Sequence, residues 1–376
     1  MPLVLTTSTN CFICSNTWLD VEFGALLQKD IIDNFNDIRI IDFRKERIFE
    51  SAEVNTIISI MKKGTSEDDV DFIMLEDSFE KSIHDTDFRT GQAISKKELL
   101  RRGSDSQHRY FGYKWSLILR APQLYHDLIK NHSEKFRAIR EVCHKTQRNN
   151  MRVLPKGYEV LTESAGTQPG KCPFLHSFKD VSSIRLDLSK QKSISHPRAR
   201  RTMEEGHFRR ADIVSNRFYG ARIFFIEGGE YFVNDSFFIG QLHDGFSIKN
   251  TMLALNSTLS LLFVELRGRK GQGGGVLTFY GPEFTGHQII DPSLLDGIDD
   301  EVYESLVTRE LGDVFEECGF DGENPIREQT PTPLPDRKVI DDFIFDILGL
   351  SQEERNEVYW YLCEAVQNRG TRAKAV

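Results

Sequence analysis

The residue types that most often perform covalent chemistry form no recognisable constellation in this sequence. The histidines contain no H-x-x-x-H pair of the kind that binds zinc from one helix face. No spacing of serine, histidine, aspartate or cysteine supports a nucleophilic triad, and no P-D…D/E-x-K cluster indicates a nuclease. We therefore expect neither a catalytic residue nor a metal site in this chain.

The six cysteines include one closely spaced pair, Cys11-Phe12-Ile13-Cys14. A zinc ribbon needs a second such pair at a suitable distance, and the sequence has none. The flanking residues are typical of a buried strand, so we expect Cys11 and Cys14 to pack in a core. The remaining cysteines are scattered and predict no disulfide framework.

Side chains suited to nucleic acid concentrate in the middle of the chain, although the net charge is −9. Residues 186–222 contain nine Lys or Arg against four acidic residues, whereas residues 296–323 contain eleven acidic residues against one Arg. Cations that neutralise phosphates release counterions and so support binding. A solvated charged loop is the alternative interpretation. The predicted phosphate contacts are Arg198, Arg200, Arg201, Arg209 and Arg210.

Two further segments have the composition of DNA contacts. Residues 145–150 are rich in side chains that hydrogen-bond base edges, and Lys145, Arg148 and Asn149 are the predicted base readers. An ordinary polar loop is the alternative. In residues 267–275, the cations Arg267, Arg269 and Lys270 lie among glycines, which allow a backbone to approach a phosphate. No strand precedes this segment, so it predicts a DNA-backbone contact or a packing turn rather than a nucleotide loop.

The elements that must position these residues begin with an α/β region. Apolar runs at 11–15, 38–43, 54–61 and 70–75 have the length of buried strands, and residues 24–35 have helical spacing. Trp18 follows the first run and is expected to fill the junction between helix and sheet. Since no domain of about 100 residues precedes this region, the sheet is predicted to be truncated on its N-terminal side.

The rest of the chain divides at polar and proline-rich segments. A boundary is expected in the polar stretch 82–106, and a stiff linker at 330–335. Between them, the sequence predicts a hairpin from 221–226 and 231–233, and one helix over 249–266. Two short helices follow, with Gly349 ending the first and a Ser351–Glu354 capping box starting the second. The predicted domains are 1–82, 107–328 and 336–370.

Three segments, in this order, resemble the gamma-class N6-adenine DNA methyltransferases of restriction–modification systems. The first is Ser15-Asn16-Thr17-Trp18-Leu19 with a helix that starts at Gly24, and the second is the run 47–58 with Phe49 before a strand. The third is 255–259, continuing through Arg267 and Arg269 to the glycines 273–275. The resemblance covers most of the chain, but residues 140–250 match the family poorly. It implies a partial doubly wound methyltransferase sheet, then an α+β target recognition domain and a short C-terminal helical segment.

The sequence departs from this family in its cofactor and catalytic motifs. It contains no F-x-G-x-G or G-x-G-x-x-G near its start and no Pro-Pro pair anywhere, so the Asn-Pro-Pro-Tyr/Phe tetrapeptide is missing. The resemblance therefore implies an N-terminal half, on a separate polypeptide or lost by truncation, that binds S-adenosylmethionine and carries this tetrapeptide. No cofactor is expected on this chain alone.

The resemblance also implies what this chain itself would do. The family removes its target adenine from the duplex before methylation, and Phe49 aligns with the phenylalanine that contacts the flipped base. A core Phe at a strand start is the alternative. The expected partners are double-stranded DNA and the missing half, and a stand-alone DNA-binding remnant or specificity subunit is the alternative function. No apolar run reaches the ~20 residues that span a bilayer, so a cytoplasmic location is expected.

Overall fold

The computed structural model describes residues 9–20, 23–44, 49, 54–84, 89–149, 159–161, 171–195, 210–270 and 275–374. The chain forms two compact units. The first comprises residues 1–125, 269–277 and 366–376, and the second comprises 126–268 and 278–365. The polar stretch 82–106 contains a strand and a helix of the first unit.

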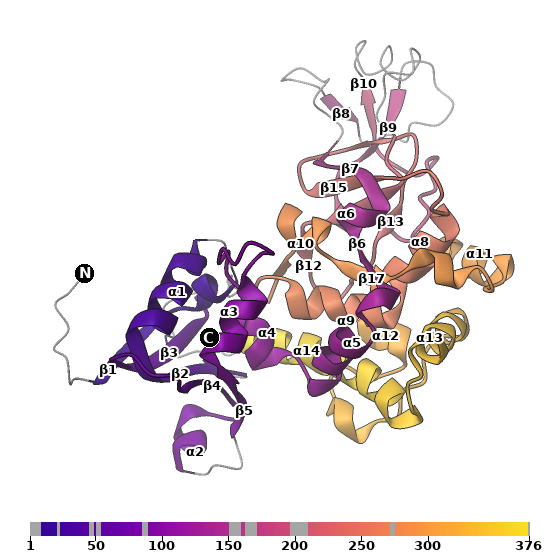
Figure 1. The fold of residues 1–376 in the computed structure, drawn as a ribbon. Helices are drawn as coiled ribbons and strands as arrows, with labels where there is room; N and C mark the ends of the chain where they lie inside the picture. Colours follow the sequence, from indigo (N-terminus) through magenta and orange to yellow (C-terminus); the bar gives the residue numbers. More distant parts are fainter. Residues whose placement is uncertain are drawn as a thin grey trace. The chain divides into compact units, whose positions relative to one another are not determined.

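The first unit contains a five-stranded mixed sheet in the order β1-β3-β2-β4-β5 (Figure 1). Its strands are β1 (Thr9–Ser15), β2 (Phe35–Phe43), β3 (Thr56–Lys63), β4 (Asp69–Leu75) and β5 (Arg89–Ser95). The four strands predicted from the apolar runs are therefore confirmed. Only β2 and β4 run parallel, and the other three pairings are antiparallel. The described sheet is thus mixed, with its one parallel pairing at its centre.

Helices cover one face of this sheet. Figure 1 shows α1 (Gly24–Asn34), α3 (Lys96–Gly103) and α4 (Trp115–Arg120) on one side, and the short α2 (Phe79–His84) on the other. Hydrophobic side chains of β2, β3 and β4 pack with the three helices into a single core cluster. Trp18 lies buried in this cluster with its ring edge toward Trp115, at a centroid distance of 5.5 Å. Its predicted place between helix and sheet is confirmed.

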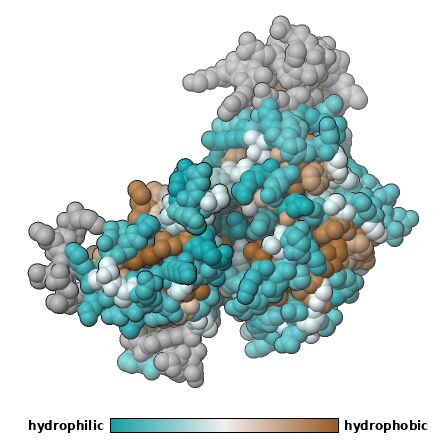
Figure 2. All heavy atoms as spheres, in the orientation of Figure 1, coloured by the Kyte–Doolittle hydropathy of each residue, from teal (hydrophilic) through white to brown (hydrophobic). Residues whose placement is uncertain are grey.

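The opposite face of the sheet is less covered. A row of aliphatic side chains crosses this face. In the strand register, Ile13 lies opposite Ile58, Ile58 lies opposite Ile41, and Ile41 lies opposite Ile73. Ile41 and Ile73 are only half-buried, and Figure 2 shows apolar residues at the surface of this unit. Cys11 and Cys14 are both exposed, so the prediction that they pack in a core is wrong. The reason is that β1 is an edge strand.

The second unit contains two small four-stranded sheets. One has the order β13-β11-β15-β7, from β13 (Ile226–Glu227), β11 (Ile213–Asn216), β15 (Phe237–Leu242) and β7 (Cys143–Arg148). The other has the order β14-β9-β10-β8, from β14 (Phe232–Val233), β9 (Lys171–Leu175), β10 (Ser193–Ser195) and β8 (Glu159–Leu161). The remaining strands form two two-stranded sheets, β17-β6 and β12-β16, from β6 (Phe136–Ala138), β12 (Phe218–Tyr219), β16 (Leu277–Thr278) and β17 (Gln288–Ile290).

The predicted hairpin at 221–233 is wrong. Its two arms pair with different partners, since β13 pairs with β11 and β14 pairs with β9. Gly228 packs against the backbone of Ala211, where an added Cβ would come within 2.0 Å of the carbonyl oxygen. The connecting turn thus lies against a third segment of the chain.

The remaining helices are mostly short, and most lie in the second unit. The predicted helix 249–266 is two helices, α8 (Ile248–Asn256) and α9 (Thr258–Arg267). Ser257 separates them, because it has extended backbone and its side chain caps the amide of Ser260. The others are α5 (Gln123–Asn131), α6 (Ile139–Val142), α10 (Gly281–Thr285), α11 (Asp300–Thr308) and α12 (Val314–Cys318), and the 3-10 turns η1 (Asn16–Leu19), η3 (Ser133–Lys135), η4 (Phe178–Asp180), η5 (Pro292–Leu295) and η6 (Ile326–Glu328).

Two helices end the described chain, α13 (Pro335–Leu348) and α14 (Gln352–Lys374). Gly349 ends α13 in the left-handed conformation, with a φ of 68°. Ser351 and Glu354 cap α14 reciprocally through amide-to-side-chain bonds of 2.8 and 3.3 Å. Both predicted helix signals are confirmed. The prediction that both helices are short is wrong for α14, which has 23 residues and ends within the first unit.

Candidate nucleic-acid interface

The carboxyl ends of three strands meet at one edge of the sheet in the first unit. β1, β2 and β4 all end there, because β2 runs parallel to β4 and both β1 and β2 run antiparallel to β3. Open α/β sheets place their ligands beyond the carboxyl ends of the strands. The segment that carries Phe49 connects β2 to β3 at this edge. Phe49 is 44% exposed, so its ring is available to a ligand.

Lys270, which precedes the glycine-rich residues, reaches the same edge. The side-chain amide of Asn55 donates a hydrogen bond to the main-chain carbonyl of Lys270. The carbonyl of Asn55 accepts from the amide of Asn16 at 3.0 Å. Three segments that resemble the methyltransferase family are thus adjacent in space. The sequence offered no signal for this contact, because its partners lie 215 residues apart.

A buried ion cluster braces this edge. The carboxylate of Asp42, near the end of β2, receives the Arg120 guanidinium at 2.6 Å and that of Arg372 at 3.6 Å. Burial raises the pKa of Asp42, but the two guanidinium groups outweigh it and hold that pKa below its usual value. Arg120 comes from α4 and Arg372 from the end of α14. This cluster therefore fixes the strand end with side chains from three distant parts of the chain.

The predicted base readers lie on and next to an edge strand of the second unit. Lys145 and Arg148 belong to β7, which is the outer strand beside β15. Lys145 is partly exposed, and the side chain of Arg148 is 51% exposed. Asn149 is buried and donates its side-chain amide to the carboxylate of Asp235. The backbone of Asn149 is left-handed, with a φ of 46°.

Of the other predicted DNA contacts, some lie in the first unit, some in the second, and some outside the described residues. Arg198, Arg200, Arg201 and Arg209 lie outside the described residues. Arg210 is exposed, 4.0 Å from the carboxylate of Asp212. Arg267 ends α9 in the second unit, whereas Arg269 and Lys270 belong to the first unit.

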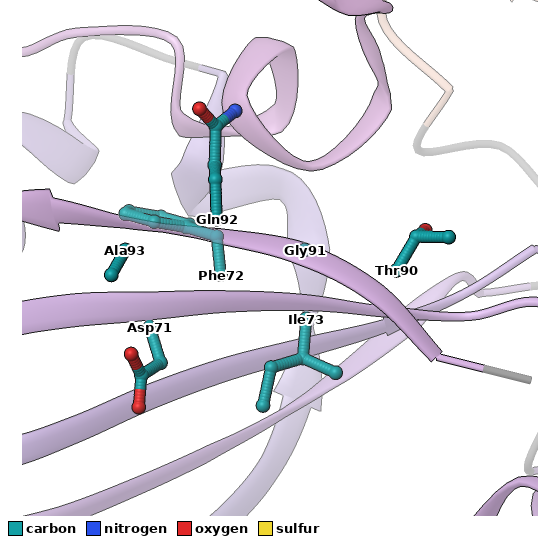
Figure 3. Close-up of a pocket in the computed structure, with 7 residues that line it drawn as sticks. All are labelled: Asp71, Phe72, Ile73, Thr90, Gly91, Gln92 and Ala93. Atoms are coloured by element: carbon teal, nitrogen blue, oxygen red, sulfur yellow. The ribbon is translucent and has the colours of Figure 1, made fainter. Parts of the chain in front are cut away.

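A shallow depression lies over β4 and β5 in the first unit (Figure 3). Gly91 opens it, because a Cβ there would come within 2.2 Å of the carbonyl oxygen of Phe72. Asp71 and Ile73 point away from Gln92, whose amide bonds the carbonyl of Ile118 at 2.8 Å on the helix side. The lining contains no pair of groups suited to acid–base chemistry. Across the described ranges, no cluster of metal-ligating side chains occurs.

Two of the strands that end at the carboxyl edge lead into described residues without a glycine-rich turn. β1 runs into η1, which Ser15 caps, and β4 leads to α2. The glycine-rich segment follows the helix α9 and not a strand.

None of the helices placed by the structure has the length and apolar character needed to cross a membrane.

Comparison with known proteins gave structural likenesses only. No family model and no curated protein matches this sequence. The chain is similar to the type IIG restriction endonuclease BpuSI, with a TM-score of 0.46 and 12% identity over 98% of this chain and 48% of that one. It is also similar to the type IIL restriction–modification enzyme MmeI in complex with DNA, with a TM-score of 0.36 and 9% identity over 96% and 50%. The chain thus spans about half the length of each enzyme.

Proposed function

We propose that this chain is the part of a site-specific adenine-N6 DNA methyltransferase that recognises the target and positions the base. The observation that carries this proposal is the Asn55–Lys270 hydrogen bond. It joins Lys270, just before the glycine-rich residues, to Asn55, which lies between Phe49 and the start of β3. A phosphate contact and an exposed aromatic ring at one edge suit a nucleotide that has left the duplex.

In this proposal, cofactor binding and methyl transfer come from a methyltransferase half with the glycine-rich cofactor loop and the Asn-Pro-Pro-Tyr/Phe motif. The support is that this sequence lacks both motifs and that no glycine-rich turn follows β1 or β4. Lys145 and Arg148 would contact DNA from the second unit, and Arg269 and Lys270 from the first. Phe49 would stack on the displaced adenine.

The test combines this chain with a polypeptide that carries the two missing motifs. We expect DNA from cells that express both to contain N6-methyladenine by mass spectrometry of nucleosides, and DNA from cells with either part alone to contain none. Phe49→Ala should lower the methylation rate about 10- to 100-fold, since base–aromatic stacking contributes about 1–3 kcal/mol. Phe49→Tyr should retain most of it.

The matched control is Phe111→Ala, which removes another exposed ring of the first unit. It should leave methylation unchanged. Equal rates for the Phe49 and Phe111 variants would remove Phe49 from the proposal. DNA binding by this chain without methylation in any combination would instead favour the stand-alone DNA-binding function.

A further inference from the structure

Two arginine side chains converge on one turn of the second unit. Arg148 from β7 and Arg217, just before β12, both donate to the main-chain carbonyl of Asp235, at 3.3 and 2.9 Å. A shared acceptor oxygen brings the two guanidinium groups close to each other. A carbonyl oxygen is neutral, so it compensates neither positive charge.

The only carboxylate described in contact with this arginine pair is that of Asp235. It lies 3.8 Å from Arg148 and is 73% exposed. Its charge is also shared with the amide of Asn149. One exposed carboxylate against two guanidinium groups leaves the cluster with a net positive charge, which is the condition for attracting an anion.

Aromatic rings fix the direction of Arg217. Its guanidinium carbon lies 5.2 Å from the ring centroid of Phe218 and 5.0 Å from that of Tyr280. A guanidinium that contacts two rings has lost much of its rotamer freedom before any ligand binds, so less entropy is lost on binding. The Phe218 ring is itself 37% exposed.

Resting on the proposed function, we infer that Arg148, Arg217 and Phe218 form a contact surface for duplex DNA. The two guanidinium groups would bind one backbone phosphate, and the exposed face of Phe218 would pack against the adjacent sugar or base. Nucleic acids alternate phosphates with flat apolar faces, and a cation beside an exposed ring matches that alternation. Arg148 was predicted from sequence as a base reader, and this arrangement makes it a phosphate contact.

The test measures binding of the full-length chain to a fluorescent duplex by anisotropy at several salt concentrations. Each phosphate contact contributes about 0.9 to the slope of log K against log salt. We expect Arg148→Gln with Arg217→Gln to reduce the slope by about one and to weaken binding at least tenfold. Phe218→Ala should weaken binding several-fold and leave the slope unchanged.

The matched control is Arg185→Gln in the same unit. Arg185 also lies over an aromatic ring, that of Tyr303, but its partners are the carboxylates of Glu227 and Glu304. This variant should bind DNA as the wild type does. Arg148→Gln alone, which changes a half-exposed side chain, serves if the double variant fails to fold, and it should still weaken binding.

Two negative outcomes have different meanings. If the wild type binds no duplex at low salt, both this inference and the proposed function are overturned. If the wild type binds duplex DNA with a salt-dependent affinity and the arginine and Phe218 variants bind equally well, only the role of this surface in DNA binding is excluded. Equal binding of a short inorganic polyphosphate and of duplex DNA, with no effect of Phe218→Ala, would show an anion site without a role in DNA contact.

Discussion

At the scale of single residues, the charge of Asp42 has the clearest structural consequence. Its carboxylate is fully buried and faces Arg120 and Arg372. Asp42→Asn would leave two guanidinium groups without their counter-charge, and breaking a buried pair in this way costs about 3–5 kcal/mol. We expect that loss in the free energy of unfolding, measured with urea. Asp71→Asn, in the exposed pair with Arg39, is the control and should cost less than about 1 kcal/mol.

The carboxyl group of Asp42 also makes the stability of the folded chain depend on pH in a defined direction. Because the pKa of Asp42 is lowered in the folded chain, its contribution is fully present above the unfolded pKa of 3.8. It is lost as the pH falls through the lower folded pKa. The stability of the Asn variant should therefore change less than that of the wild type in this acidic range.

His287 predicts a pH dependence at milder acidity. Its ring stacks on Phe225, and its Nε2 lies 2.9 Å from the hydroxyl of Ser260. Burial, with a smaller effect from the charge of Arg267, lowers the pKa of His287 to about 3. Below the unfolded pKa of 6.5, the unfolded chain therefore binds a proton that the folded chain cannot. We expect stability to fall by about 1.4 kcal/mol per pH unit between pH 6 and 4 from this group.

The variant His287→Phe keeps the stacked ring and removes the titrating group. It should be less stable at pH 7, because Ser260 loses its partner. It should, however, lack the part of the stability loss at acidic pH that comes from His287. Urea unfolding at several pH values measures both quantities. Parallel slopes for the variant and the wild type would contradict a neutral buried His287.

At the scale of elements, two glycines end helices in the same left-handed conformation but in different surroundings. Gly349 ends α13 with a φ of 68°, and nothing lies within 4 Å of an added Cβ. Gly319 ends α12 with a φ of 75°, and a Cβ there would lie 2.1 Å from the carbonyl oxygen of Thr332. Gly349→Ala should cost about 1–2 kcal/mol from the backbone alone. Gly319→Ala should cost clearly more, and equal losses in thermal unfolding would contradict this account.

The C-terminal end of α14 tests the organisation of the whole molecule. Residues 366–376 belong to the first unit together with 1–125 and 269–277. Arg369 donates to the carbonyl of Gly275, and Arg372 faces Asp42. A chain that ends at Ala365 loses both contacts. We expect faster hydrogen exchange in β2 and β4, with β11 and β15 still protected.

The point variant Arg372→Gln is the comparison for this truncation. It should reproduce part of the increased exchange in β2, because the rest of the segment still packs. Unchanged exchange in the first unit of the truncated chain would mean that residues 366–376 do not stabilise it.

Several elements could be predicted from the sequence because their signals are local. The strands β1 to β4, the helix α1, the glycine end of α13 and the capping box of α14 each depend on residues a few positions apart. The candidate site was predictable only in part. Phe49, Lys145 and Arg148 were recognised by residue type or by resemblance, whereas Arg217 and Phe218 were not singled out.

Features that depend on long-range pairing were decided by tertiary structure alone. The arms of the expected hairpin at 221–233 carry suitable residues, yet they pair with strands of separate sheets, and Gly228 between them packs on Ala211. The contact between Asn55 and Lys270 likewise joins residues that no local signal in the sequence connects. Helix capping and hydrophobic periodicity depend on residues within a few positions of each other, so the sequence reveals them. Sheet order and contacts between loops depend on which distant surfaces pack together, and the spacing of residues along the chain does not reveal that.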